Sequence, residues 1–185
     1  EEAIREYDKA IALDPNNPIF HYNKGLTLAY LGRYEEAIKE YDKAIALDPN
    51  NPIFHNNKGF VLYMLGRHEE AIREYDKAIA LDPNDPDYHY NKGTALAYLG
   101  RYEEAIREYD KAIALDPNNP DYHNNKGNAL SDLGRYEEAI KEYDLAISLN
   151  PNNPRYHNNK GTALYDLGRY EEALKEFDKA IALDP

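Results

Sequence analysis

The apolar and polar positions of this chain repeat with a period of 34 residues. Each repeat begins at a proline that follows Asn-Asn or Asn-Asp, and these prolines are Pro18, Pro52, Pro86, Pro120 and Pro154. The chain therefore divides into a half repeat (1–17) and repeats 18–51, 52–85, 86–119, 120–153 and 154–185. A fixed period of this length is typical of solenoids, in which similar helical or strand units stack on one another. We expect residues 1–185 to form a single solenoid domain.

The first half of each repeat predicts a helix. In repeat 18–51, Asn17 can cap a helix whose first residue is Pro18, a position where the missing N–H is no loss. Apolar side chains then recur at helical spacing, as Phe20, Leu28 and Leu31. Gly32 follows the last turn and is expected to end the helix, since glycine adopts the backbone conformation found there.

The second half of each repeat predicts another helix. Glu35 and Glu36 suit its first turn, where the helix dipole favours negative charge. Its apolar stripe consists of Ala37, Ile38, Tyr41, Ala44, Ile45 and Leu47. The helix should stop at Asp48-Pro49, because a residue before proline avoids the α-helical conformation. Short connections favour antiparallel helix pairs, and one pair cannot bury its own stripe, so an all-α stack of pairs is expected.

A glycine lies in the middle of every first helix, at Gly25, Gly59, Gly93, Gly127 and Gly161. Glycine there destabilises a helix by roughly 1 kcal/mol relative to alanine. Its recurrence predicts that a second helix crosses closely at this point. We expect Ala37 and Ala44, with their equivalents, to form the facing surface.

These positions together resemble the tetratricopeptide repeat family, over the whole length of the chain. The residues that carry the resemblance are Gly25, Leu28, Leu31, Gly32, Ala37, Tyr41, Ala44 and Pro49. The resemblance implies a right-handed superhelical solenoid of antiparallel helix pairs. It also implies that the first helices line a concave face that commonly binds peptides or partner helices. His21 and Lys24 stand where the family usually has Trp and Leu, and we expect these changes to loosen the packing without altering the fold.

Sequence variation among the repeats gathers at the second, fifth, ninth, twelfth and thirteenth positions of the first helix. Offsets of three, four and seven residues place such positions on one helical face. In the N-terminal repeats the candidate binding residues are Ile19, Tyr22, Leu26, Tyr30, Ile53, Phe60, Tyr63 and Met64. In the C-terminal repeats they are Asp87, Tyr90, Tyr98, Asp121, Asn128, Asp132 and Asp166. This contrast predicts a peptide ligand with apolar anchors at one end and Lys or Arg at the other; the alternative is that exposed positions simply drift.

One polar position on the first helix does not vary. It is occupied by Asn23, Asn57, Asn91, Asn125 and Asn159. An amide can donate and accept, so these side chains could pair with the backbone of an extended peptide. Such an arrangement resembles the asparagine ladder in the repeat region of O-linked N-acetylglucosamine transferases. The alternative is that each asparagine braces the neighbouring repeat, and both interpretations stay open at this stage.

The sequence offers little support for catalysis or for a cofactor. The regularly spaced histidines, such as His21 and His55, lie on successive helices that pack about 8–10 Å apart, too far to share an ion at bond lengths of about 2 Å. Phosphate-binding and dinucleotide-binding motifs and Ser/His/Asp groupings are not recognisable. We therefore expect no metal, no cofactor and no enzymatic activity.

Charge and hydropathy narrow the range of partners. The net charge of −12 disfavours nucleic acid and anionic membranes. No apolar stretch approaches the roughly 18 residues of a membrane span, and a cytoplasmic location is the default expectation. The sequence thus predicts a scaffold that holds a protein or peptide segment. The alternatives are end-to-end self-association of the solenoid, and a recruiting arm of an enzyme whose catalytic domain lies outside the chain.

Overall fold

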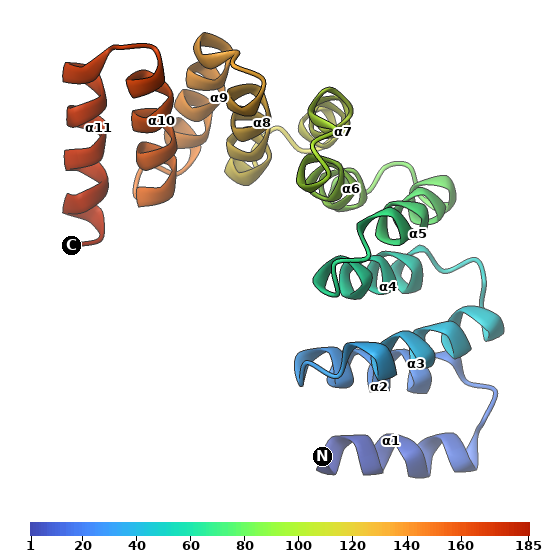
Figure 1. Ribbon diagram of the computed structural model, residues 1–185. Helices are drawn as coiled ribbons and strands as arrows, with labels where there is room; N and C mark the ends of the chain where they lie inside the picture. Colours follow the sequence, from blue (N-terminus) through green and yellow to red (C-terminus); the bar gives the residue numbers. More distant parts are fainter. The chain divides into compact units, whose positions relative to one another are not determined.

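The computed structural model describes residues 1–185 and consists of helices and short connections, with no strand (Figure 1). The helices are α1 (Glu2–Leu13), α2 (Pro18–Tyr30), α3 (Tyr34–Leu47), α4 (Pro52–Met64), α5 (His68–Leu81), α6 (Pro86–Tyr98), α7 (Tyr102–Leu115), α8 (Pro120–Asp132), α9 (Tyr136–Leu149), α10 (Pro154–Asp166) and α11 (Tyr170–Leu183). The expected all-α class and helix pairing are confirmed. None of the helices combines the length and the apolar character required to cross a membrane.

The chain divides into two compact units. Unit 1 comprises Glu1–Ala95 and unit 2 comprises Leu96–Pro185, so the division falls within α6. In unit 1, α2 pairs with α3 and α4 pairs with α5, while α1 packs on α2 and α3 packs on α4. In unit 2, α8 pairs with α9 and α10 pairs with α11, while α7 packs on α8 and α9 packs on α10. Each unit therefore buries its apolar stripes by the same alternation of contacts within and between repeats.

The even-numbered helices begin where the sequence predicts. At α4, the Asn51 side chain accepts a hydrogen bond from the Ile53 backbone N–H at 3.1 Å, and Pro52 occupies the first helical position. At α6 the cap is an aspartate, and Asp85 accepts from the Asp87 N–H at 2.9 Å. Either side chain satisfies a backbone donor that has no partner within the helix.

The same helices end in a glycine turn. Gly32 has a φ of 74°, in the left-handed region that glycine adopts without steric cost. The Gly32 N–H donates to Ala29 O at 3.0 Å, and the Arg33 N–H donates to Leu28 O at 2.9 Å. This pair of bonds satisfies carbonyls that the helix itself leaves unpaired. It also reverses the chain within three residues, which sets α3 antiparallel to α2.

The mid-helix glycines do mark the closest approach of paired helices, but the facing group differs from our expectation. A Cβ atom on Gly25 would lie 2.7 Å from Cε1 of Tyr41, whose side chain is buried. In the last repeat, Phe177 takes the same place against Gly161. The alanines expected to face the glycine, Ala37 and Ala44, are fully buried, but it is the aromatic ring between them that needs the space.

Candidate functional site

The variable face of α2 and α4, in unit 1, exposes large apolar side chains. Six of the candidate residues are between 39% and 93% exposed, namely Ile19, Leu26, Tyr30, Ile53, Phe60 and Met64. They occupy equivalent positions on two helices that contact each other directly. We call these six residues the unit 1 apolar face. Soluble proteins seldom expose such residues in a group, and a group of this kind is typical of an interaction surface.

Two candidate aromatic residues of unit 1 lie differently. Tyr22 is half-buried, with its ring centroid 5.0 Å from that of Phe54 and 6.1 Å from that of Tyr41. Its hydroxyl accepts a hydrogen bond from Asn57 Nδ2 at 2.8 Å, and burial raises its pKa. Tyr63 is also half-buried and packs edge-on against His68 at 5.0 Å. Both rings are therefore partly enclosed by neighbouring side chains and offer less surface to a ligand than the residues of the unit 1 apolar face.

The invariant asparagines connect successive first helices. Asn57 donates to Tyr22, Asn91 donates to Asn56 at 3.0 Å, and Asn159 donates to Asn124 at 2.9 Å. In each case the acceptor is the fifth residue of the preceding repeat. These bonds fit the bracing interpretation of the asparagines. In these three repeats the Nδ2 group of the asparagine thus donates within the protein.

Two acidic candidates in unit 2 have different surroundings. Asp121 is paired with Arg155 Nη2 and accepts from the Tyr156 hydroxyl at 2.8 Å, so its charge is compensated. Asp132 is exposed on α8, and partial desolvation raises its pKa. Asp121 thus contributes little to the acidic character that the sequence suggested for these repeats.

The other candidates lie on the first helices as expected. Asp87 and Asp166 are exposed, and Tyr98 is 69% exposed. Tyr90, Asn125 and Asn128 are half-buried, and Asn23 is half-buried near the middle of α2. Each residue therefore has at least part of its surface open to solvent.

A buried ion network lies behind each first helix, and the sequence analysis did not anticipate it. In the first repeat, His21 Nδ1 lies 2.7 Å from Glu40 Oε2. The other carboxylate oxygen of Glu40 lies 2.9 Å from Lys43 Nζ and 3.4 Å from Lys24 Nζ. Lys24 also reaches Asp8 of the preceding half repeat at 2.6 Å. The His and Lys that depart from the family pattern are therefore joined in one network, where we expected looser packing.

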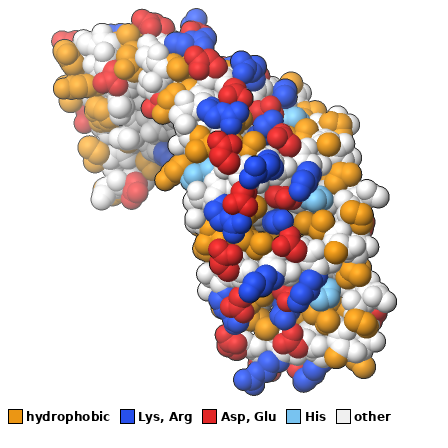
Figure 2. Space-filling view, turned by 45° about the vertical axis from the view of Figure 1, so that its right-hand side comes forward, with side chains coloured by type: hydrophobic (Ala, Val, Ile, Leu, Met, Phe, Trp, Pro, Cys, Tyr) orange, Lys and Arg blue, Asp and Glu red, His pale blue; other side chains and the backbone are white.

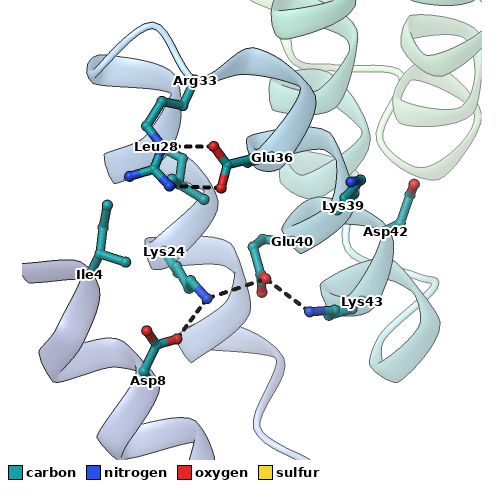
Figure 3. Close-up of a pocket in the computed structure, with 10 residues that line it drawn as sticks. All are labelled: Ile4, Asp8, Lys24, Leu28, Arg33, Glu36, Lys39, Glu40, Asp42 and Lys43. Atoms are coloured by element: carbon teal, nitrogen blue, oxygen red, sulfur yellow. Dashed lines mark hydrogen bonds and ion pairs between the residues drawn. The ribbon is translucent and has the colours of Figure 1, made fainter. Parts of the chain in front are cut away.

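This network borders a hollow between α1, α2 and α3 (Figure 3). Its lining residues are Ile4, Asp8, Lys24, Leu28, Arg33, Glu36, Lys39, Glu40, Asp42 and Lys43. Figure 3 shows Lys24 between the two carboxylates of Asp8 and Glu40, with Lys43 on the far side of Glu40 and Arg33 turned towards Glu36. Most of the charges are paired with one another, so the hollow offers few groups to a ligand. The ion pairs of Lys24 with Asp8 and Glu40 connect α2 to α1 and α3.

The network recurs along the chain. His55 with Glu74, His123 with Glu142 and His157 with Glu176 repeat the short contact at 2.7 to 2.8 Å. Lysines reach back to the preceding repeat in the pairs Lys58–Asp42, Lys92–Asp76, Lys126–Asp110 and Lys160–Asp144. Figure 2 shows such charges as a band of alternating blue and red, with His side chains beside it. The sequence contains a signal for this network, because its His, Lys, Glu and Asp residues all recur with the period of 34 residues.

The electrostatics of the network favour an ionised carboxylate. Burial of the Glu74 carboxyl would raise its pKa, but hydrogen bonds from His55 and Lys77 and the nearby charge of Lys58 outweigh this effect. The pKa of Glu74 is lowered to about 2 as a result. The pKa values of Glu40, Glu142 and Glu176 are lowered for the same reasons. No group of three or more His, Asp or Glu side chains is arranged to hold a metal ion.

Solved structures similar to this chain are helical repeat proteins. The crystal structure of MamA is 28% identical, with a TM-score of 0.81 over 86% of this chain and 94% of that one. The crystal structure of YrrB, described as a TPR protein with an unusual peptide-binding site, is 26% identical, with a TM-score of 0.78 over 97% of this chain and 92% of that one. MamA residues 41 to the end from Desulfovibrio magneticus RS-1 are 23% identical, with a TM-score of 0.85 over 90% and 94%. This last likeness concerns the fold alone.

Family models agree with these structures. A model described as TPR repeat matches residues 1–30, 25–66, 61–97, 93–134 and 127–168, and a model described as Tetratricopeptide repeat matches 154–185. A comparison with curated proteins gives no match. Family models cover the full length of the chain, and the chain folds into helix pairs joined by glycine turns. The chain therefore belongs to the tetratricopeptide repeat family.

Proposed function

We propose that this chain binds a protein or peptide segment on the variable face of its first helices and does not catalyse a reaction. The observation that carries the proposal is the unit 1 apolar face, in which six large apolar side chains are exposed on two adjacent helices. Such side chains supply most of the binding free energy when a partner covers them. The peptide-binding site named for YrrB supports the same role for a protein of similar fold.

The chemistry of the unit 1 apolar face favours apolar anchors on the ligand. Ile19, Leu26 and Tyr30 follow one another along α2, and Ile53, Phe60 and Met64 do so along α4. Aliphatic or aromatic side chains of a partner would remove this surface from water, at roughly 25 cal/mol for each Å² buried. A Met and aromatic rings allow close packing against ligands of more than one shape.

The acidic first-helix residues of unit 2 favour basic residues on a ligand. Asp132 and Asp166 are exposed, whereas Asp121 is compensated by Arg155. In this proposal the invariant asparagines act indirectly. By bonding to the preceding repeat, Asn57 and Asn159 hold neighbouring first helices in a fixed register, so that the exposed side chains beside them are preorganised for binding.

A peptide-array screen with the full chain tests this function. Peptides that bind the unaltered chain should bind Tyr30→Ala and Met64→Ala variants about tenfold more weakly or worse, as central apolar anchors usually do. Leu47→Ala is the matched control, because Leu47 is 39% exposed but lies on α3, outside the proposed surface. Equal binding by all three variants would contradict the proposal.

Self-association is a second candidate, favoured by one observation on α11. Leu174 and Ile181 are each 61% exposed. The residues equivalent to Leu174, among them Ile38 and Ile72, are at most 9% exposed because the next repeat covers them. A second copy of the chain could cover α11 instead. Sedimentation velocity at increasing protein concentration should then show a larger species that Leu174→Glu abolishes, and a constant monomer would exclude this candidate.

A further inference from the structure

A small polar hollow lies on the variable face of unit 2. It is lined by Asn128, Ser131, Asp132, Tyr143, Asn159 and Thr162, which come from α8, α9 and α10. In the first two repeats the positions of Asn128 and Asp132 carry Leu26 with Tyr30, and Phe60 with Met64. The polar lining of unit 2 therefore replaces side chains that are apolar or aromatic in the first two repeats.

One wall of the hollow is held in place by hydrogen bonds. The Tyr143 hydroxyl donates to Asn128 Oδ1 at 2.8 Å, and Asn159 Nδ2 donates to the same oxygen at 3.2 Å. Asn159 Nδ2 also donates to Asn124, whose side chain is fully buried. These two donors occupy both lone pairs of the Asn128 carbonyl oxygen and fix the orientation of its amide. The wall is therefore preorganised, which reduces the entropy lost when a ligand group is bound.

The hollow also carries an uncompensated charge. Asp132 contributes a carboxylate whose pKa is raised by desolvation alone, and it has no basic partner. Ser131 adds a hydroxyl oxygen, and the Thr162 hydroxyl donates to Asn158 O at 3.1 Å, which leaves its oxygen as an acceptor. A carboxylate partly removed from water is stabilised by a charged donor, and the planar guanidinium of arginine can bond several oxygens at once.

We propose that this hollow binds an arginine side chain of the bound peptide, with Asp132 as its charge partner. The inference rests on the proposed peptide-binding function and assigns the basic residue of the ligand to one site. Of the other acidic candidates in unit 2, Asp121 is neutralised by Arg155, and Asp166 is exposed but does not line the hollow. Asp132 alone combines a negative charge with a walled site.

The test uses the full chain labelled with ¹⁵N and two small probes. Acetyl-arginine methylamide should shift the side-chain amide signals of Asn128 and Asn159 in a saturable way. Acetyl-citrulline methylamide, which has nearly the same shape without the charge, should bind about tenfold more weakly or worse. Equal responses to the two probes, or no response of these amides to the arginine probe, would overturn the proposal.

Three variants locate the effect. Asp132→Asn keeps the size of an exposed side chain and should weaken arginine binding about tenfold or more, whereas Asp178→Asn should leave it unchanged, because Asp178 is exposed on α11, outside the proposed binding surface. Tyr143→Phe removes the hydroxyl that orients Asn128, and it should weaken binding severalfold. The fold should tolerate this change, since Phe177 packs against Gly161 as Tyr143 packs against Gly127. Undiminished binding by Asp132→Asn or Tyr143→Phe would count against the site.

The two proposals fail in different ways. If peptide binding still depends on Tyr30 and Met64 but the arginine probe does not bind, the proposed arginine site is contradicted and the proposed function stands. If the arginine probe binds through Asp132 but no peptide depends on the unit 1 apolar face, the proposed function fails. The arginine site would then be a separate property of unit 2.

Discussion

The ring of Tyr41 occupies the space into which a side chain at Gly25 would project, with Cε1 2.7 Å from the Cβ position. Tyr41 is 1% exposed and has little freedom to move aside. We therefore expect Gly25→Ala to destabilise the chain by about 1–3 kcal/mol through overpacking, even though alanine is the better helix former by about 1 kcal/mol. Urea unfolding followed by circular dichroism would measure the change.

A double-mutant cycle provides the control for this prediction. If the ring is the obstacle, Gly25→Ala should cost much less in a Tyr41→Leu background, because the two residues interact directly. Equal costs in both backgrounds would show that the glycine serves another purpose. Gly32→Ala offers a comparison, since a Cβ there meets no atom within 4 Å and only the φ of 74° opposes it.

The ion network makes stability depend on acid pH. Because the pKa of Glu74 falls from its ordinary 4.5 to about 2 on folding, its contribution is fully present above pH 4.5 and is lost as the pH falls towards 2. By linkage this contribution is on the order of 3 kcal/mol at most. Glu74→Gln should reduce the loss of stability between pH 4.5 and 2, as measured by urea unfolding at several pH values.

Glu70→Gln serves as the control for that titration. Glu70 also has a lowered pKa, through its hydrogen bonds to Arg67, but it lies at the surface, where water screens the pair. Its removal should change the pH profile much less than Glu74→Gln does. Identical profiles for the two variants would place the origin of acid sensitivity outside the buried network.

The brace between the last two repeats can be broken at one side chain. Asn159 donates to Asn124 and Asn128, and Asn124 is completely buried. Asn159→Ala leaves the Asn124 carbonyl without this donor, so we expect a loss of about 1–3 kcal/mol. Hydrogen exchange should show faster opening of α10 in this variant. Unchanged exchange would mean that the packing of α10 on α9 suffices to hold the two repeats.

The first helices are capped by an asparagine or by an aspartate, and the effect of each residue type on stability can be compared. Asn51→Ala should destabilise the chain by about 1 kcal/mol, because the Ile53 N–H loses its acceptor. Asn51→Asp should be tolerated, since Asp85 fills the equivalent place before α6 with a bond of 2.9 Å. Thermal unfolding monitored by circular dichroism distinguishes the two, and equal melting temperatures for both variants would contradict the role of the cap.

Helix boundaries were predictable because they depend on local chemistry. Pro18 and Gly32 constrain the backbone directly, and Asn17 needs only a donor two residues away, the Ile19 N–H at 3.1 Å. The position of the variable face was also predictable, since the spacing along one helix determines it. The exposure of Tyr30 and Phe60 agrees with that prediction.

The contacts between helices were not predictable in the same way. Nothing in the spacing of Gly25 shows that a ring fills the gap, because the partner lies on another helix. His21 and Glu40 are 19 residues apart, and Lys24 and Asp8 are 16 apart. The family pattern shows that His21 and Lys24 replace the usual Trp and Leu. Only the structure shows that they contact Glu40 and Asp8.

The pairing of Lys58 with Asp42 has a consequence for how such a chain can evolve. Every full repeat presents an Asp of this kind to the repeat that follows and a Lys to the repeat that precedes it. Duplication or loss of one whole 34-residue repeat therefore leaves an Asp facing a Lys where the two newly adjacent repeats meet. The length of the array can therefore change by one whole repeat without leaving an unmatched charge between neighbouring repeats.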